Sequence, residues 1–168
     1  MSREVMAVEP MGRIEIRQMT ERDLDEVMEI ERKSFPSPWS RRLFERELLL
    51  PYAHVFVARE IPPHRVGGYL CFWLVERETH ILNLAVHPDR RRRGIGSLLI
   101  RYGLDYSWEK GAREISLEVR RSNYKAISLY RSFHFQPQGI RPRYYSDSGE
   151  DAVIMSLQLV DPTPPTSP

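Results

Sequence analysis

The sequence contains little cysteine and little lysine. Cys71 is the single cysteine, which excludes an intramolecular disulfide and a CxxC metal or redox pair. The basic charge comes almost wholly from arginine, because only Lys33, Lys110 and Lys125 are lysines among 25 basic residues. An enzyme that works through a lysine Schiff base therefore has few candidates here.

A strong net charge, a long apolar run and a histidine metal motif are also missing. The formal net charge is only +2, which argues against a surface coated in basic residues for nucleic acid. No apolar run approaches the ~20 residues that span a membrane, and the N-terminus lacks a signal-peptide core. We expect a soluble cytoplasmic protein with no metal, no membrane partner and no direct nucleic-acid partner. The five histidines without HExxH-like spacing are His54, His64, His80, His87 and His134.

The length of 168 residues suits one domain that buries its own core. The first residues show no sustained periodicity, and the last ones are rich in Pro, Ser and Thr. We therefore expect a flexible N-terminal extension over 1–12, one domain over 13–160 and a disordered tail over 161–168.

Within the domain, strand-like and helix-like periodicities alternate. Thr20, Ser40 and Asn123 are suited to cap helices, and Gly111 to end one. The pattern predicts a mixed α/β fold whose central sheet has about seven strands, with helices on both faces. Strands are expected over 13–18, 53–60, 66–76, 79–86, 113–119, 135–145 and 152–159, and helices over 21–34, 41–50, 96–110 and 123–133.

The stretch HPDRRRRGIGSLLI, residues 87–100, joins an expected strand to an expected helix. The first N–H groups of that helix lack intrahelical partners, and the helix dipole is positive there. Gly94 and Gly96 leave the backbone open to a ligand, and arginines offer forked donors that suit phosphate oxygens. The loop is neither a Walker A motif nor the dinucleotide fingerprint, since Leu99 stands where the third glycine belongs. From these residues alone, a pyrophosphate cradle and a solvated basic turn both remain open.

The string Arg91-Arg92-Arg93-Gly94-Ile95-Gly96 resembles the R/Q-x-x-G-x-G/A loop of the GCN5-related N-acetyltransferases (GNAT). Downstream, LEVRRSNYKAISLYRSFHF (117–135) and RPRYYSDSGEDAVIMSL (141–157) resemble the RimI-type ribosomal-protein-alanine branch and its archaeal N-terminal acetyltransferase relatives. The resemblance covers about residues 13–159. It implies the GNAT fold and transfer of an acetyl group from acetyl-CoA to a protein N-terminal amine. The alanine of a small-subunit ribosomal protein is the leading acceptor that it implies.

The resemblance also implies roles for single residues. Glu118 matches the general base, Tyr130 the general acid, and Asn123 an asparagine that contacts the cofactor. The implied contacts to the pantetheine arm are the backbone of Leu84, Ala85 and Val86, and those to the pyrophosphate are Arg91, Arg92, Arg93, Gly94, Ile95, Gly96 and Ser97.

The residue types suit the implied chemistry. An α-amine, with a pKa near 7.7–8.0, must lose a proton before it attacks a thioester, and a carboxylate can accept that proton. A phenol can protonate the thiolate that leaves. Without the motif, Glu118 reads as a glutamate on the polar face of a strand, and Tyr130 as part of a helix core.

On the acceptor side, SFPSPWS and RYYSDSGEDA resemble the family's substrate loops, which implies contacts from Phe35, Trp39, Tyr144 and Tyr145. Hydrophobic packing is the alternative role for these residues. One departure is His134, which stands where many family members carry a glycine at the end of the helix, and it could alter the aim of Tyr130. A non-glycine residue at a left-handed helix end costs roughly 1 kcal/mol.

Two other functions remain open. Within the same enzyme class, the acceptor could be a lysine side chain or a small amine, because the cofactor half of the site is shared. Outside it, the chain could be a non-enzymatic module that binds anions or RNA. Such a module would use Arg90–Arg93, Arg120, Arg121, Arg141 and Arg143.

Overall fold

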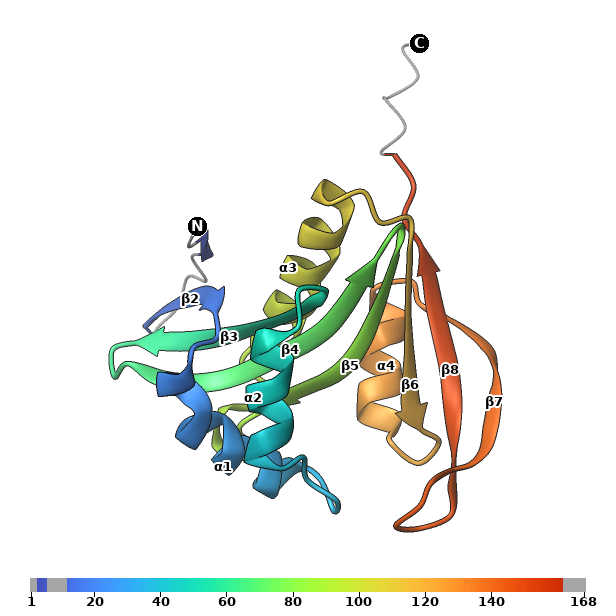
Figure 1. The fold of residues 1–168 in the computed structure, drawn as a ribbon, viewed down its shortest axis with the longest axis horizontal. Helices are drawn as coiled ribbons and strands as arrows, with labels where there is room; N and C mark the ends of the chain where they lie inside the picture. Colours follow the sequence, from blue (N-terminus) through green and yellow to red (C-terminus); the bar gives the residue numbers. More distant parts are fainter. Residues whose placement is uncertain (1–2, 6–11, 162–168) are drawn as a thin grey trace.

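In the computed structural model, which describes residues 3–5 and 12–161, one mixed sheet runs through the molecule (Figure 1). Its strand order is β1-β2-β3-β4-β5-β6-β8-β7, and within the described residues only the β5–β6 pair is parallel. The strands are β1 (Arg3–Val5), β2 (Arg13–Gln18), β3 (Ala53–Ile61), β4 (Arg65–Val75), β5 (Glu78–Val86), β6 (Glu114–Arg120), β7 (Gln136–Tyr145) and β8 (Glu150–Gln158). The helices are α1 (Leu24–Ser34), α2 (Arg41–Leu49), α3 (Ile95–Glu109) and α4 (Tyr124–Ser132), with 3-10 turns η1 (Glu21–Asp23) and η2 (Pro88–Arg90).

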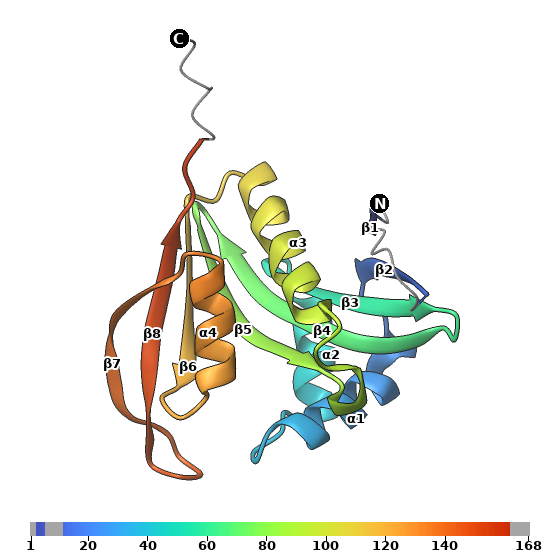
Figure 2. The ribbon, with the colours of Figure 1, turned by 180° about the vertical axis from the view of Figure 1, so that it is seen from behind.

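The helices cover both faces of the sheet. Helices α1 and α2 lie on the face seen in Figure 1, and α3 and α4 lie on the opposite face, which Figure 2 shows from behind. The two faces have separate apolar cores. One contains Val27 and Phe44 from α1 and α2, and the other contains Leu99 and Tyr130 from α3 and α4. The predicted mixed α/β fold, with seven strands between residues 13 and 158, is confirmed, and the short β1 adds an eighth strand.

Local chemistry explains where the helices begin and end. The Ser40 side chain accepts from the Leu43 N–H at 3.2 Å, and the Asn123 side chain accepts from the Ala126 N–H at 3.2 Å, so both predicted caps are present. The expected helix over 21–34 begins with the 3-10 turn η1, where the Thr20 N–H donates to the Asp23 carboxylate at 2.9 Å. Gly111, with φ of 93°, follows α3.

Helix α4 ends in an unusual residue. His134 has a φ of 71°, which is the left-handed region that glycine adopts most easily. The chain turns back there because the Phe135 N–H donates to the Tyr130 carbonyl at 3.1 Å. The helix therefore ends as a glycine-terminated helix would, with a histidine in the glycine's place.

The predicted terminal segments lie largely outside the described residues. Residues 1–2, 6–11 and 162–168 are not described, and they hold most of the expected N-terminal extension and tail. Within the extension, Arg3–Val5 pair as β1 with Ile14–Ile16 of β2. In the described part of the chain, no helix is long and apolar enough to cross a membrane.

Candidate functional site

Strands β5 and β6 separate, and this separation shapes the site. They pair in parallel over four residue pairs, from Glu78 with Glu114 to Ile81 with Leu117, and then diverge (Figures 1 and 2). Leu82 follows the last pair and is a bulge in the β4–β5 ladder, where Cys71 pairs with Asn83 and Phe72 with Ile81. Because a bulge bends its strand, it turns β5 away from β6. Residues 82–86 thus have no ladder partner on the β6 side within the described chain.

The loop after β5 presents free backbone donors. Gly94 caps α3 in a left-handed conformation, with a φ of 79°, and the first backbone bond of the helix runs from the Leu98 N–H to the Gly94 carbonyl at 3.0 Å. The N–H groups of Ile95, Gly96 and Ser97 therefore precede that bond and can receive an anion. A Cβ built on Gly96 would lie 3.4 Å from Leu129 and 3.6 Å from Val86, whereas one on Gly94 would meet nothing within 4 Å.

The loop arginines have different partners. The Arg91 Nε donates to the Val86 carbonyl at 3.1 Å and its guanidinium donates to the Ser34 hydroxyl at 3.3 Å, which ties the loop to β5 and α1. Arg90 lies 3.1 Å from the Glu60 carboxylate, and Arg93 lies 3.8 Å from it. Arg92 is exposed and makes no ion pair within the residues described, so its charge is available to a bound anion.

Glu118 lies on β6 just beyond the point where β5 and β6 separate. One of its oxygens lies 2.5 Å from His80 Nε2 on β5, and the other lies 3.5 Å from Arg141 Nε on β7. The hydrogen bond from His80 lowers the pKa of Glu118 below its usual value, with a further contribution from Arg141 and against the opposing effect of burial. The side chain is only 12% exposed but is ionised near neutral pH.

His80 is a site residue that the sequence analysis missed. It is 38 residues from Glu118, and only the β5–β6 register brings the two together, with His80 opposite Ser116 and Glu118 two residues further along the same face. Because the ionised carboxylate can only accept, His80 Nε2 carries the proton in this hydrogen bond.

Tyr130 is a buried phenol on α4. Burial raises its pKa, and the nearby Tyr145 raises it further. Its ring meets the edge of Phe135, with 5.6 Å between the ring centroids. Tyr145 in turn feels the charge of Glu118, and burial, the largest effect, raises the pKa of Tyr145 to about 12. The three groups thus share one neighbourhood, in which both phenols keep their protons near neutral pH.

The predicted acceptor residues lie in two segments that touch each other. Phe35 and Trp39 belong to the segment between α1 and α2, and the Trp39 ring packs on Phe44 at 5.2 Å between centroids. Tyr144 and Tyr145 end β7, and their rings meet edge to face at 5.1 Å. A hydrogen bond of 3.2 Å from Ser37 to Asp147 joins the two segments.

Opposite charges neutralise several arginines expected of a nucleic-acid module. Arg120 pairs with Asp147 at 2.8 Å and its guanidinium lies 4.0 Å from the centre of the Tyr145 ring. Arg121 pairs with Asp151, and Arg141 with Glu118. This pairing weighs against an RNA-binding surface, since free basic side chains supply most of the affinity for phosphate backbones.

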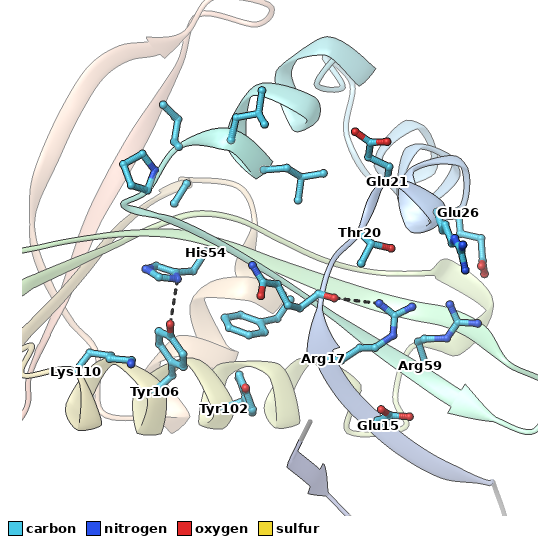
Figure 3. A pocket seen from close by; sticks show the side chains of 18 of the residues that line it. Glu15, Arg17, Thr20, Glu21, Glu26, His54, Arg59, Tyr102, Tyr106 and Lys110 are labelled. Carbon is cyan, nitrogen blue, oxygen red and sulfur yellow. Dashed lines mark hydrogen bonds between the residues drawn. The ribbon is translucent and has the colours of Figure 1, made fainter. Parts of the chain in front are cut away.

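A separate hollow lies on the β2–β3 side of the molecule (Figure 3). The Tyr106 hydroxyl and His54 Nδ1 lie 3.2 Å apart there, and Arg17 and Arg59 both pair with Asp23. None of the predicted site residues lines it. In the part of the chain that the structure describes, no group of histidine, cysteine or acidic side chains could hold a metal ion.

Comparison with known proteins identifies relatives of the chain. The profile described as the acetyltransferase (GNAT) family matches residues 24–135. A Bacillus subtilis protein, provisionally named a ribosomal protein bS18-alanine N-acetyltransferase, is 45% identical over 145 residues, which are 86% of this chain and 95% of the relative. The Mycobacterium tuberculosis N-alpha-acetyltransferase RimI is 36% identical over 151 residues, 86% of this chain and 92% of its own length.

Solved structures share the fold. The ribosomal-protein-S18-alanine N-acetyltransferase from Escherichia coli superposes with a TM-score of 0.79 and 30% identity, covering 90% of this chain and 98% of the other. Ard1 from Thermoplasma volcanium gives 0.81 and 26%, covering 88% and 99%. NAA60 from Arabidopsis thaliana, solved in complex with acetyl-CoA, gives 0.79 at 20% identity over 87% and 98%, a likeness of fold.

Proposed function

Because the chain belongs to the acetyltransferase (GNAT) family, we propose that it transfers the acetyl group of acetyl-CoA to the N-terminal α-amine of a protein. The resemblance to this family and to its ribosomal-protein-alanine branch, predicted from the sequence, is confirmed. The observation that carries the proposal is the place of Glu118: an ionised carboxylate stands where β5 and β6 separate, in hydrogen-bond contact with His80.

The residues around the separation fit acetyl-CoA. The unpaired backbone of Leu84–Val86 can bond an extended pantetheine arm, as a neighbouring strand would. The free N–H groups of 95–97 and the Arg92 guanidinium suit the pyrophosphate, and Asn123 lies at the start of α4 beside this region. Acetyl-CoA supplies an activated acetyl group, and the protein's residues orient it and move protons.

The proton transfers then follow from the groups present. Glu118 accepts a proton from the attacking amine, directly or through water, and His80 stabilises its charged form beforehand. Tyr130 keeps its proton at neutral pH and donates it to the leaving sulfur. Direct attack needs no acyl-enzyme, and Cys71 is buried with its pKa raised by burial, which makes it unsuited to act as a nucleophile.

The leading acceptor is the N-terminal alanine of ribosomal protein bS18, which is the substrate in the names of several relatives. An α-amine also places less demand on Glu118 than a lysine does. Near pH 7 about a tenth of an α-amine is neutral, against well under a thousandth of a lysine amine with a pKa of ~10.4.

The test compares three peptides by mass spectrometry of acetyl transfer. The first begins with alanine and continues with the bS18 sequence, the second has the same sequence with a blocked N-terminus, and the third carries an internal lysine. We expect transfer to the free N-terminus alone. Modification of lysine in the blocked peptide, at a rate equal to that of the free N-terminus, would reassign the enzyme to lysine acetylation.

A further inference from the structure

Glu31 is a buried carboxylate that takes no part in the proton transfers described above. It lies in α1 and is only 1% exposed, next to the apolar core under α1 and α2. Burial, the largest effect, raises its pKa, although three hydrogen bonds oppose that change. It makes no ion pair within the described chain. A buried carboxylate is costly to keep in a core, so its hydrogen bonds deserve a functional explanation.

The two oxygens of Glu31 face different parts of the molecule. Oε1 accepts the backbone N–H of Trp39 at 2.8 Å. Oε2 accepts from Asn83 Nδ2 at 3.0 Å and from the Tyr69 hydroxyl. The Asn83 amide also donates to the Tyr69 hydroxyl at 3.2 Å, which closes a buried three-membered network.

These partners belong to opposite sides of the proposed reaction centre. Trp39 lies in the segment between α1 and α2, which resembles the acceptor wall. Asn83 lies between the bulge residue Leu82 and Leu84, where the unpaired backbone of β5 begins. One carboxylate thus connects the acceptor wall directly to the cofactor strand.

We propose that Glu31 is a positioning residue whose carboxylate sets the distance between the acceptor wall and β5, and thereby the alignment of the amine with the acetyl group. The inference rests on the function proposed above. Alignment matters because small displacements of bound reactants cost large factors in rate.

An amide cannot replace this carboxylate. The side chain of Glu31→Gln has one oxygen, so either Trp39 or the Tyr69–Asn83 pair must face an NH₂ group. Because the Trp39 N–H and the Asn83 amide are both donors, one of them then loses its acceptor.

Glu47→Gln is a matched control. Glu47 is also 1% exposed, lies on α2 in the same half of the molecule, and accepts a side-chain hydrogen bond from Trp73 Nε1 at 2.7 Å. None of its hydrogen bonds reaches β5 or the 35–40 segment. Any general effect of neutralising a buried glutamate appears in both variants.

The experiment measures acetyl transfer to an alanine-first and a leucine-first peptide, together with acetyl-CoA affinity by calorimetry. For Glu31→Gln we expect at least a tenfold rise in KM for the alanine peptide, weaker discrimination between the peptides, and an acetyl-CoA Kd within twofold of the parent. Glu47→Gln should leave all three unchanged. Parent-like peptide kinetics in folded Glu31→Gln, or equal changes in Glu47→Gln, would overturn the proposal.

Two further measurements keep the test decisive. If Glu31→Gln fails to fold, Tyr69→Phe removes one donor from the same carboxylate and keeps the ring, and a smaller rise in peptide KM is expected. Amide exchange at Trp39, followed by NMR, should quicken at least tenfold in Glu31→Gln and not in Glu47→Gln. This readout needs no turnover, so it separates failure of the inference from failure of the proposed function, which the parent enzyme tests with the alanine peptide alone. Unchanged exchange at Trp39 would refute the inference.

Discussion

The carboxylate of Glu118 accepts a hydrogen bond from His80 and faces the Arg141 guanidinium, and both partners favour its charged form. A general base must be unprotonated to work, so activity is lost as the pH falls through the pKa of Glu118. Because that pKa is lowered in the folded protein, the loss is expected below the usual range of a glutamate.

His80→Ala should therefore move the acidic limb of the kcat profile to higher pH. It removes the largest effect that lowers the pKa of Glu118, while burial continues to raise it. The measurement is kcat at saturating peptide across pH, where titration of the free amine does not interfere. His64→Ala, at an exposed histidine in the β3–β4 turn, is the control. A profile of His80→Ala that coincides with that of the control would contradict the assignment, and Glu118→Gln itself should lower kcat by about 10²–10⁴.

Tyr130→Phe should lower kcat by about 10²–10⁴ and leave acetyl-CoA affinity largely intact. The substitution keeps the ring against Phe135 and removes only the hydroxyl that would protonate the leaving sulfur. Pre-steady-state kinetics should be used, so that chemistry rather than product release is observed. Tyr52→Phe, far from the site and packed on Trp73, should behave like the parent. Normal chemistry in Tyr130→Phe would remove the proposed acid.

Gly94→Asp should weaken acetyl-CoA binding at least about tenfold, or about 1.4 kcal/mol, compared with Gly94→Asn. Both substitutions impose a side chain on the same left-handed backbone, which aspartate and asparagine tolerate similarly, so they differ mainly in charge. Calorimetry gives the two dissociation constants directly. Equal constants would show that no anion lies near this residue.

At the scale of elements, the end of α4 carries a local strain that is open to measurement. His134→Gly should raise the free energy of unfolding by about 0.5–1 kcal/mol, because glycine adopts a φ of 71° without steric cost. Urea denaturation detects a change of this size. His134→Ala keeps the strain and should show no such gain, and a gain of equal size in that variant would point to another cause. Since the helix closes on the Tyr130 carbonyl in either case, turnover should be preserved.

Periodicity predicted the helices and strands between residues 13 and 159, because each buries one face and repeats at its own spacing. The resemblance to known motifs, in turn, predicted the family. The partner of Glu118 could not be predicted this way, since alternation along β5 says nothing of the β6 residue opposite His80. Glu31 did leave a signal. The apolar stripe of Leu24, Val27 and Met28 continues to position 31, where a glutamate stands.

At the scale of the molecule, the sheet is two half-sheets, β1–β5 and β6–β8, held edge to edge by only four residue pairs. Beyond Ile81 the edge of β5 offers backbone groups to whatever lies next to it. A pantetheine arm bonded there would act as an additional strand, completing the sheet with atoms that the polypeptide does not supply.

Binding of CoA should then protect a particular stretch of backbone as well as raise overall stability. At 100 times its Kd, any ligand adds about 2.7 kcal/mol to the free energy of unfolding. Adenosine 3′,5′-bisphosphate, which lacks the pantetheine, should do the same at an equal multiple of its own Kd. Hydrogen exchange separates the two ligands: CoA should slow the amides of 82–86, and the shorter nucleotide should not. If both ligands protected 82–86 equally, the arm would not be bonded to β5. With the arm in place, each catalytic turn would exchange one temporary strand of the sheet for another, so the protein would loosen and tighten in step with its cofactor.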